Sequence, residues 1–177
     1  MSQKIHPAAT AGSHLPVNRS FTADQAVFCC LKQWIRLRYP AVSSIEAEQL
    51  EQILAGDGAA DWLILDARSP AEFEFSHLGG ATLVEADGSI ADMESFTTLP
   101  RDRSIVVCCS VGVRSAARVA ELRREGFSRA FNLEGGLFKW VRDGRSLLRD
   151  GEPTLLVHPY NRLWGRLLTA KNRSREN

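Results

Sequence analysis

The sequence predicts an α/β fold: a mostly parallel central sheet with helices on both faces, extended by a helical segment at each end of the chain. Three short apolar runs, at residues 62–66, 105–109 and 130–133, are typical of buried strands. Segments with helical spacing of apolar residues lie between them. This alternation indicates a parallel sheet covered on both faces, and ligands of such sheets bind at the carboxyl ends of the strands.

We expect four parts along the chain. Residues 1–20 lack apolar periodicity and are predicted to be disordered. Residues 21–41 are predicted to form an N-terminal amphipathic helix, residues 42–146 the α/β domain, and residues 147–177 a C-terminal extension with a short basic amphipathic helix. The 177 residues suit one domain with extensions and are enough to bury a core.

In the N-terminal helix, Phe28 and Leu31 follow helical spacing and Pro40 ends the pattern. We expect this helix to pack on the flank of the domain rather than to dock on a membrane or a partner. Cys29 and Cys30 fall within it and are expected to be packing residues.

The domain is predicted to begin with a helix. Ser43 and Glu46 have the spacing of a capping box, and the helix they start should end near Gly56. The apolar run at residues 62–66 is the first predicted strand. It is the first of the strands whose carboxyl ends should face a ligand.

A second capping box follows this strand. Ser69 and Glu72 have its spacing, and Pro70 at the first helical position supports a short helix. A brief strand at residues 81–84 and a loop around Asp87 come next. These elements lead to the central strand at residues 105–109.

The loop after the central strand is the strongest candidate site. Residues 109–115 read Cys-Ser-Val-Gly-Val-Arg-Ser. Backbone N–H groups in a tight loop and in the first turn of the next helix lack intrahelical partners, so they can hold an anion. Their partial positive charge, with Arg114 nearby, favours the thiolate of a cysteine over the thiol. Gly112 permits backbone angles that a side chain would forbid.

The remaining elements of the domain follow the loop. Ser115 is placed to cap a helix that ends towards Gly126. Residues 130–133 are expected to form the next strand and residues 136–142 the last helix. The strand pattern therefore puts the cysteine loop at the carboxyl edge of the sheet.

Composition excludes several classes of function. Net charge is +1, with basic and acidic residues interspersed, so we expect no nucleic-acid partner. No apolar run approaches the ~20 residues that cross a bilayer, and residues 1–20 lack the apolar core of a signal peptide. The four cysteines form two vicinal pairs rather than a disulfide framework, which indicates a reducing compartment and a cytoplasmic location.

Four separated stretches resemble a rhodanese domain of the single-domain sulfurtransferase type, over about residues 42–144. Residues 62–73 are similar to the family's strand-Asp-x-Arg-x-x-x-Glu-Phe signature, and residues 76–81 to its Gly-His-Ile-x-Gly-Ala turn. Residues 109–115 match the active-site Cys-Arg-x-Gly-x-Arg-Ser pattern, and residues 132–140 the closing Leu-x-Gly-Gly-x-x-x-Trp element. One such stretch is a weak signal, whereas four in the right order are specific.

The resemblance implies a double displacement at Cys109. Its thiolate would take the outer sulfur of thiosulfate or a persulfide, and a thiol, cyanide or a protein acceptor would remove that sulfur. No metal or organic cofactor is implied. The persulfide would be held by the rest of the loop: Ser110, Val111, Gly112, Val113, Arg114 and Ser115.

Two positions depart from the family pattern. Ser76 stands where glycine is usual, and Ser110 stands where a basic residue is common. Because Ser110 and Val111 leave Arg114 as the one cation of the loop, thiosulfate is expected to be a poor donor. A low-molecular-weight or protein persulfide is the alternative donor.

Three further residues near the strand ends have structural and functional interpretations. Asp66 and Arg68 could polarise the site, but paired charges at strand ends more often tie the framework together. His77 could act as a general base, but a lone histidine more often fixes its own turn through a ring N–H. We favour the framework role for all three. The four histidines are scattered and predict no metal site.

In the C-terminal extension, apolar residues recur at helical spacing between arginines and lysines. The apolar positions are Tyr160, Leu163, Trp164, Leu167 and Leu168. A basic amphipathic helix can lie on a membrane surface. Gly165 interrupts it, so we expect it to pack against the domain or the N-terminal helix, without peripheral or integral membrane association.

Other functions remain open at this stage. Counting from Cys108 gives Cys-x5-Arg, the longer loop of cysteine phosphatases and arsenate reductases, whereas Cys109 gives Cys-x4-Arg, sized for one sulfur atom. Gly112 lies three residues after Cys109 and no histidine precedes Cys108, so we favour Cys109. A non-catalytic binding module is a further alternative. A redox pair is disfavoured because adjacent cysteines close a strained ring.

Overall fold

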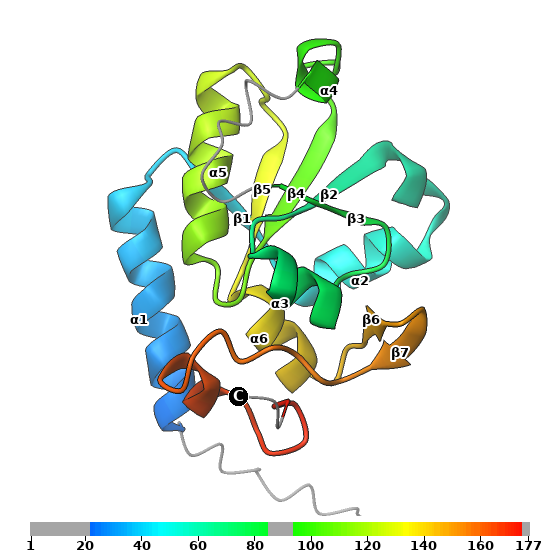
Figure 1. The fold of residues 1–177 in the computed structure, drawn as a ribbon. Coiled ribbons are helices and arrows are strands. Elements are labelled where there is room, and N and C mark those ends of the chain that lie inside the picture. The colour runs from blue at the N-terminus through cyan, green and yellow to red at the C-terminus, as the bar shows by residue number, and fades with distance from the viewer. Residues whose placement is uncertain (1–21, 85–93, 175–177) are drawn as a thin grey trace, which may run out of the picture.

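The computed structural model describes residues 22–84 and 94–174, which form an α/β domain flanked by an N-terminal helix and an extended C-terminal segment (Figure 1). The predicted disorder of residues 1–20 and the loop around Asp87 lie outside the described residues. The predicted α/β class is confirmed, with five parallel strands in the main sheet among the described residues.

The strands of this sheet run in the order β1-β5-β4-β2-β3. Their bounds are β1 Ser43–Ile45, β2 Trp62–Asp66, β3 Ala81–Leu83, β4 Ser104–Cys108 and β5 Ala130–Leu133. Asp66 pairs with Cys108, and Val107 pairs with Asn132. The carboxyl ends of β2, β4 and β5 therefore meet at one edge of the sheet, as the sequence predicted.

The structure corrects the start of the domain. Ser43 is not a helix cap, because Ser43–Ile45 forms the edge strand β1 and pairs with β5. The helix begins later, as α2 Ala47–Ala55, with Glu46 as its N-cap. Glu46 and Gln49 form the capping box, and the backbone N–H of Glu46 donates to Gln49 Oε1 at 3.1 Å. Residues Ser43–Ile45 are thus used for sheet pairing, and Glu46 separates them from the helix.

Side chains of β4 alternate between two cores. Ile105 and Val107 face a core built with α5 Val113–Arg124 and with Phe96 of α4 Glu94–Thr97. Val106 and Cys108 face the other core, built with α2 and α6 Gly136–Arg142. All of β4 is buried, so the strand before the cysteine loop is fixed on both faces. The layers are visible in Figure 1.

Helix α1 Ala23–Arg38 begins at the N-cap Thr22, which forms a capping box with Gln25. Phe28 and Leu31 pack against the core of α2 and α6, as predicted. Cys29 and Cys30 are exposed, so the expectation that they are packing residues is wrong. Cys29 lines a pocket together with Phe28, and Cys30 lines a groove together with Leu31.

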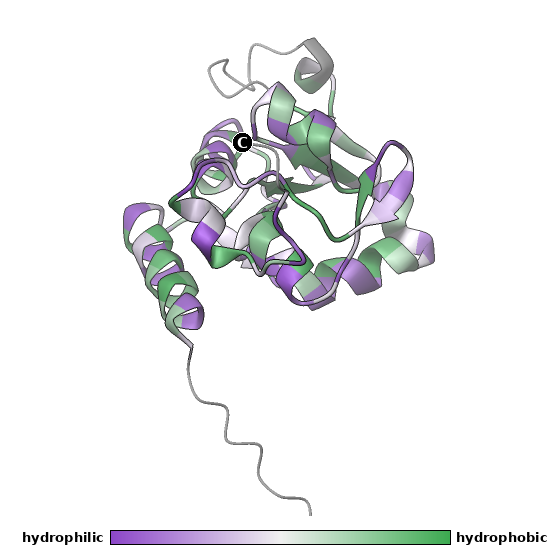
Figure 2. Cartoon of the chain, turned by 60° about the horizontal axis from the view of Figure 1, so that its bottom comes forward, coloured by the Kyte–Doolittle hydropathy of each residue, from purple (hydrophilic) through white to green (hydrophobic). Residues whose placement is uncertain are grey.

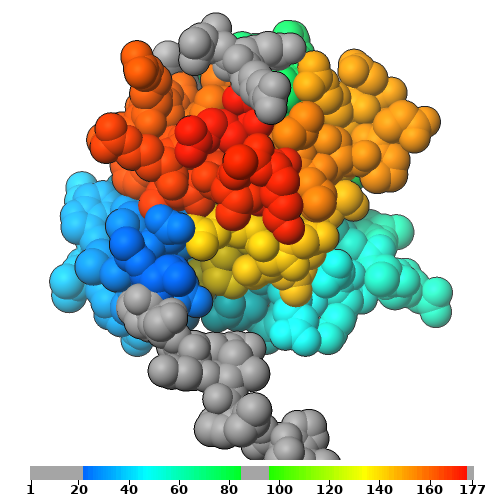
Figure 3. All heavy atoms as spheres, turned by 90° about the horizontal axis from the view of Figure 1, so that it is seen from below, coloured from blue at the N-terminus to red at the C-terminus, as the bar shows by residue number. Residues whose placement is uncertain are grey.

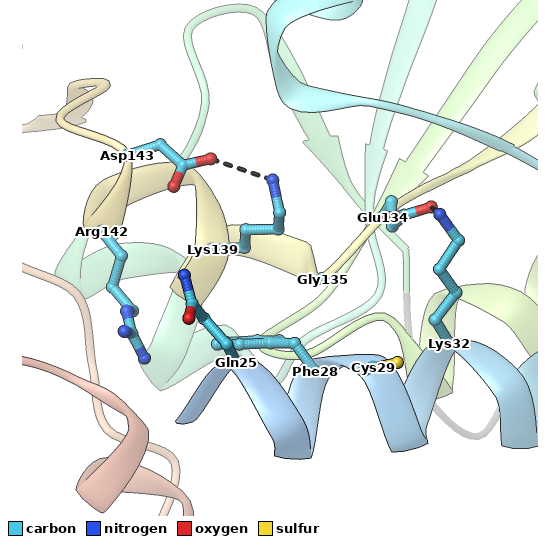
Figure 4. A pocket seen from close by; sticks show the side chains of 9 residues that line it. All are labelled: Gln25, Phe28, Cys29, Lys32, Glu134, Gly135, Lys139, Arg142 and Asp143. Carbon is cyan, nitrogen blue, oxygen red and sulfur yellow. Dashed lines mark hydrogen bonds and ion pairs between the residues drawn. The ribbon is translucent and has the colours of Figure 1, made fainter. Parts of the chain in front are cut away.

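Two ion pairs also hold α1 in place. Asp24 binds Arg142 of α6 at 3.2 Å, and Lys32 binds Glu134 at 2.7 Å. Figure 4 shows α1 and α6 on either side of a shallow pocket, with Lys32 reaching Glu134. The N-terminal helix is therefore docked through both apolar and charged contacts.

After α6, the chain forms a two-stranded antiparallel hairpin, β6 Leu147–Arg149 and β7 Glu152–Thr154. The predicted C-terminal amphipathic helix is wrong: within the described residues 155–174, the helical structure consists of the 3-10 turn η3 Trp164–Leu167. Its side chains are used for tertiary contacts instead. Leu167 and Leu168 are buried in the core, and Asn172 donates to the carbonyls of Val141 and Leu155.

Seen from below, the C-terminal segment, drawn orange to red, lies across the molecule alongside α1, drawn blue, and α6, drawn yellow (Figure 3). In the hydropathy view of Figure 2, apolar residues are mixed with polar residues along the exposed ribbon of α1. Among the described residues, no helix is both long and apolar enough to span a bilayer.

Candidate active site

Cys109 lies directly after β4, at the carboxyl edge of the sheet, and its residue is 1% exposed. The backbone N–H of Gly112 donates to Cys109 Sγ at 3.2 Å, and Ser115 Oγ lies 3.3 Å from the same sulfur. Gly112 has φ +91° and is the N-cap of α5. The left-handed backbone of Gly112 turns the chain around the sulfur and into the helix.

The N-terminal turn of α6 holds the start of this loop. The N–H of Leu137 donates to Cys109 O at 2.8 Å, and the N–H of Phe138 donates to Ser110 O at 3.0 Å. At the preceding residue, Gly136, an added Cβ would lie 2.4 Å from Cys109 O and 2.7 Å from Ser110 O. Only glycine therefore allows α6 to approach the loop this closely.

The structure contradicts the predicted capping role of Ser115. It is not the N-cap of α5, because Gly112 takes that position and the helix begins at Val113. Ser115 lies in the first turn, is fully buried, and its Oγ lies 2.6 Å from Asn132 Oδ1 as well as 3.3 Å from Cys109 Sγ. A hydroxyl has one proton, so it donates to one of these two groups at a time. The hydroxyl can therefore donate to a thiolate or accept from a thiol.

Glu72 belongs to the site, although the sequence predicted only its role in the capping box of a helix. Its Oε1 accepts from Ser110 Oγ at 2.7 Å, and its carboxylate accepts from both terminal nitrogens of Arg114 at 2.9 and 3.0 Å. Its Oε2 also accepts from the N–H of Ser69, which completes the predicted capping box of α3 Pro70–Phe75. One buried carboxylate thus ties α3 to the cysteine loop.

These contacts set the charge of Glu72. Burial by itself raises the pKa of a carboxyl group, but the hydrogen bonds from Arg114, Ser110 and Ser69 outweigh it and lower the pKa of Glu72 to about 2. For Arg114, burial lowers the pKa, but the hydrogen bond to Glu72 together with the charges of Cys109, Glu72 and Tyr160 outweighs it, and the pKa is raised overall. Both groups are charged at neutral pH, and the charge of Arg114 is offset by Glu72 rather than free in the loop.

Cys108 lies beside Cys109 in sequence but away from the loop in space. Its side chain is fully buried in the core of α2 and α6. Burial raises the pKa of the Cys108 thiol well above its usual value, and the charge of Asp66 raises it further. Cys108 is therefore a neutral core thiol at physiological pH.

Asp66 and Arg68 form a fully buried ion pair at the end of β2. Arg68 Nη2 donates to Asp66 Oδ2 at 2.7 Å and to the carbonyl of Ser76 at 2.6 Å. His77 Nδ1 lies 2.9 Å from the carbonyl of Phe73, and its ring stacks on Phe73 with centroids 4.1 Å apart. These contacts tie β2 and α3 to the following turn. The framework role that we favour for these residues stays a prediction.

The C-terminal segment reaches the edge of the cysteine loop. The guanidinium carbon of Arg114 lies 4.8 Å from the ring centroid of Tyr160, a cation–π contact. Tyr160 has φ +62°, which is rare for a bulky residue. Trp164 lines a groove together with Val113, the first residue of α5. No part of the sequence pattern signalled these contacts.

The seven loop residues that the sequence singled out fall into three groups. Cys109, Gly112 and Ser115 surround the sulfur. Ser110 and Arg114 bind Glu72 instead of pointing freely into the loop. Val111 belongs to the buried core, and Val113 packs against it. In the described ranges 22–84 and 94–174, no three His, Cys, Asp or Glu residues gather as a metal site.

Glu72, Asn132 and Gly136 complete the site. Each lies in a stretch that carried the family resemblance, but none was singled out as a site residue. The signal for Glu72 was its place in the Glu-Phe signature after β2. Gly136 was one of two adjacent glycines before a helix, a pattern that indicates a close backbone approach.

Comparison with known proteins gives a consistent result. The rhodanese-like domain family matches residues 46–143. A sulfurtransferase of Allochromatium vinosum is 34% identical over 112 residues, which cover 58% of this chain and 92% of that protein. A Mycobacterium tuberculosis protein named "probable adenylyltransferase/sulfurtransferase MoeZ" is 37% identical over 89 residues, covering 46% of this chain and 22% of that protein. The chain thus spans about a fifth of that longer relative.

Solved structures agree with the fold. A rhodanese-like domain protein from Staphylococcus aureus superposes with a TM-score of 0.52 and 27% identity, covering 62% of this chain and 99% of that one. The polysulfide-sulfur transferase of Wolinella succinogenes superposes with a TM-score of 0.55 and 20% identity, covering 70% and 90%. The latter likeness concerns the fold alone. The family match, the sheet topology and the cysteine loop together identify this chain as a member of the rhodanese-like domain family, whose relatives include sulfurtransferases.

Proposed function

We propose that this protein is a sulfurtransferase that carries a sulfane sulfur on Cys109. The observation that carries the proposal is the position of Cys109 Sγ, at the end of β4 and within 3.3 Å of both the Gly112 N–H and the Ser115 hydroxyl. Both groups can donate to a negatively charged sulfur. First-turn N–H groups of a helix lack intrahelical acceptors and favour a nearby anion, and α5 begins four residues after Cys109.

The first half of the reaction forms a persulfide. The Cys109 thiolate attacks the outer sulfur of a donor R–S–SH, the new S–S bond forms at Cys109, and the donor leaves as R–S⁻ with the electron pair of the broken bond. In the second half, an acceptor thiolate attacks the outer sulfur, and Cys109 leaves as its thiolate. No electrons are gained or lost overall, so the cycle needs no redox cofactor.

Charge in the loop favours a persulfide over thiosulfate as the donor. The sulfonate end of thiosulfate needs a free cation, and the guanidinium of Arg114 is neutralised by two hydrogen bonds to Glu72. Ser110 supplies a hydroxyl that also binds Glu72. A persulfide carries its transferable sulfur without a sulfonate and fits this loop better.

The cysteine phosphatase and arsenate reductase alternative requires Cys108 as the nucleophile. The Cys108 side chain is fully buried, and burial raises the pKa of its thiol. Both observations argue against Cys108 as the nucleophile. Cys109 is also buried, but its Sγ accepts a hydrogen bond from the N–H of Gly112 in the loop at 3.2 Å. The loop that begins at Cys109 is the better candidate.

The test is sulfur transfer to cyanide, measured as thiocyanate formed from a small persulfide and from thiosulfate. Wild type and Cys108→Ala should both form thiocyanate, with the persulfide preferred, and Cys109→Ser should form none. Equal activity of Cys109→Ser would exclude the proposed nucleophile. No activity of wild type with either donor would favour a non-catalytic binding module, and release of phosphate from an aryl phosphate would favour the phosphatase.

A further inference from the structure

The C-terminal segment forms a cavity of about 780 Å³ that is partly open to solvent, and one of its lining residues, Tyr160, contacts Arg114 of the cysteine loop. Its lining includes two aromatic rings, three arginines and a serine: His158, Tyr160, Arg162, Arg166, Arg173 and Ser174. A volume of this size suits a small molecule rather than a single ion. None of the cysteine-loop residues 109–115 lines this cavity. The proposed sulfur transfer does not use its lining residues.

The charge of this cavity is positive. Its described lining holds three guanidinium groups and no aspartate or glutamate. Arg173 donates to the carbonyl of Leu168, and none of the three arginines forms an ion pair with a carboxylate in the part of the chain that the structure describes. Unpaired guanidinium groups around one cavity attract anions and bind carboxylates bidentately.

A buried hydroxyl in the lining also lacks a partner. Ser174 is 7% exposed, and its Oγ has no hydrogen-bond partner within the described residues. Buried polar groups almost always have a hydrogen-bond partner. An unpartnered buried hydroxyl therefore indicates that a bound polar group serves as its partner. An oxygen-rich anion held by the neighbouring guanidinium groups would accept its proton.

Tyr160 links the lining of the cavity to Arg114 of the cysteine loop. One face of its ring contacts the guanidinium of Arg114 at 4.8 Å, and Tyr160 also lines the cavity. Arg114 in turn donates to Ser110 Oγ at 3.0 Å, next to Cys109 in the chain. Tyr160 is therefore shared by the lining of the cavity and by the contacts of the cysteine loop.

We infer that this arginine-lined cavity binds the carboxylate groups of a small acidic thiol or of its persulfide, and so selects the sulfur substrate. The inference rests on the proposed sulfur transfer and adds the substrate class. It supplies the cations that the loop lacks, because Arg114 is engaged by Glu72. The persulfide sulfur would face Cys109, and the thiolate R–S⁻ formed by transfer would leave through the same cavity.

Binding can be tested without any sulfur transfer. S-methylglutathione carries two carboxylates and no reactive sulfur, and its diethyl ester is the matched ligand without them. Calorimetry on the full chain should give a Kd for the acid at least about tenfold lower than for the diester, since charged groups are bound through charge-assisted hydrogen bonds. The double variant Arg162→Ala/Arg166→Ala should lose this preference.

Lys171→Ala is the matched control, because Lys171 is an exposed cation of the same segment but does not line the cavity. It should keep the preference. Equal Kd values for acid and diester in wild type, or an equal loss in Lys171→Ala and in the double variant, would overturn the inference. So would an oligoribonucleotide that binds at Arg162 and Arg166 while S-methylglutathione does not bind.

Kinetics then separate this inference from the proposed function. With the persulfides of glutathione and of its diethyl ester as donors, the ratio of their kcat/KM values should fall about tenfold or more in the double variant. An unchanged ratio would overturn the inference while leaving Cys109 as the sulfur carrier. If neither donor loads sulfur on wild type, the proposed function fails, and calorimetry alone decides whether the cavity binds carboxylates.

Discussion

The carboxylate of Glu72, on α3, binds the guanidinium of Arg114, on α5, through hydrogen bonds of 3.0 and 2.9 Å. Ser110 completes the arrangement by donating to Glu72 at 2.7 Å. The loop between Cys109 and Arg114 is therefore held from one side by α3 and from the other by the first turn of α6. The loop that begins at Cys109 is thus held by contacts from α3, α5 and α6.

We predict that Glu72 makes stability depend on acid pH. The pKa of Glu72 is lowered to about 2 in the folded protein, so its contribution is complete above the usual pKa of glutamate and is lost as the pH falls towards 2. The shift corresponds to roughly 3 kcal/mol. Urea unfolding between pH 5 and pH 2 should show this loss in wild type and a smaller one in Glu72→Gln.

Glu74→Gln is the control, because Glu74 is exposed on the same helix. It should follow the wild-type curve. If Glu72→Gln and wild type lost stability in parallel, the buried contacts of Glu72 would not be what lowers its pKa.

Gly136→Ala should be one of the most damaging substitutions in the domain. Its Cβ would lie 2.4 Å from Cys109 O, and φ is +60° at this position. We expect a loss of about 3 kcal/mol or more, measured by chemical unfolding. Gly58→Ala, with no atom within 4 Å of the added carbon, should change stability by less than about 1 kcal/mol. Similar losses in both would show that the α6 approach is not tight.

Ser115→Ala should slow the reaction of Cys109 with iodoacetamide at neutral pH. The variant removes a donor 3.3 Å from the sulfur, and a hydrogen bond to a charged group is worth about tenfold in an equilibrium. Peptide mapping of alkylated protein gives the rate at Cys109. Ser128→Ala is the control, because Ser128 is exposed and distant in sequence from the loop. Equal alkylation rates in both variants would show that the Ser115 hydroxyl does not stabilise the Cys109 thiolate.

Cys108 should remain unmodified in the native protein. Burial raises the pKa of its thiol, so its contribution to stability is present below the usual thiol pKa and is lost as the pH rises above it. Alkylation at pH 8 should label the exposed Cys29 and Cys30 and leave Cys108 intact until the protein unfolds. Labelling of Cys108 as fast as Cys30 would contradict its place in the core.

The strands of the sheet could be predicted because their signal is local. Residues 62–66 and 130–133 are apolar runs of strand length between turn residues, and they form β2 and β5. Edge strand β1 could not be predicted in this way. Ser43 and Ser44 are exposed polar residues, and their strand geometry comes from pairing with Phe131 and Asn132, far along the chain.

The sequence predicted only those residues of the site that lie close together along the chain. Cys109, Gly112 and Ser115 lie in one loop whose spacing is readable. The partners that fix this loop are distant in sequence: Glu72 lies 38 residues before Ser110, and Asn132 lies 17 residues after Ser115. The C-terminal helix was mispredicted because Leu167 and Leu168 follow helical spacing but bury themselves in the domain core from an irregular backbone.

The central claim is that Cys109 carries the transferred sulfur. The most direct measurement is the mass of the intact protein and of its cysteine peptides after incubation with a small persulfide donor and removal of excess reagent. The account predicts one added sulfur atom, located on Cys109 and removed by cyanide, in wild type and in Cys108→Ala but not in Cys109→Ser. A cyanide-labile sulfur that persists in Cys109→Ser, or that disappears only in Cys108→Ala, would contradict it.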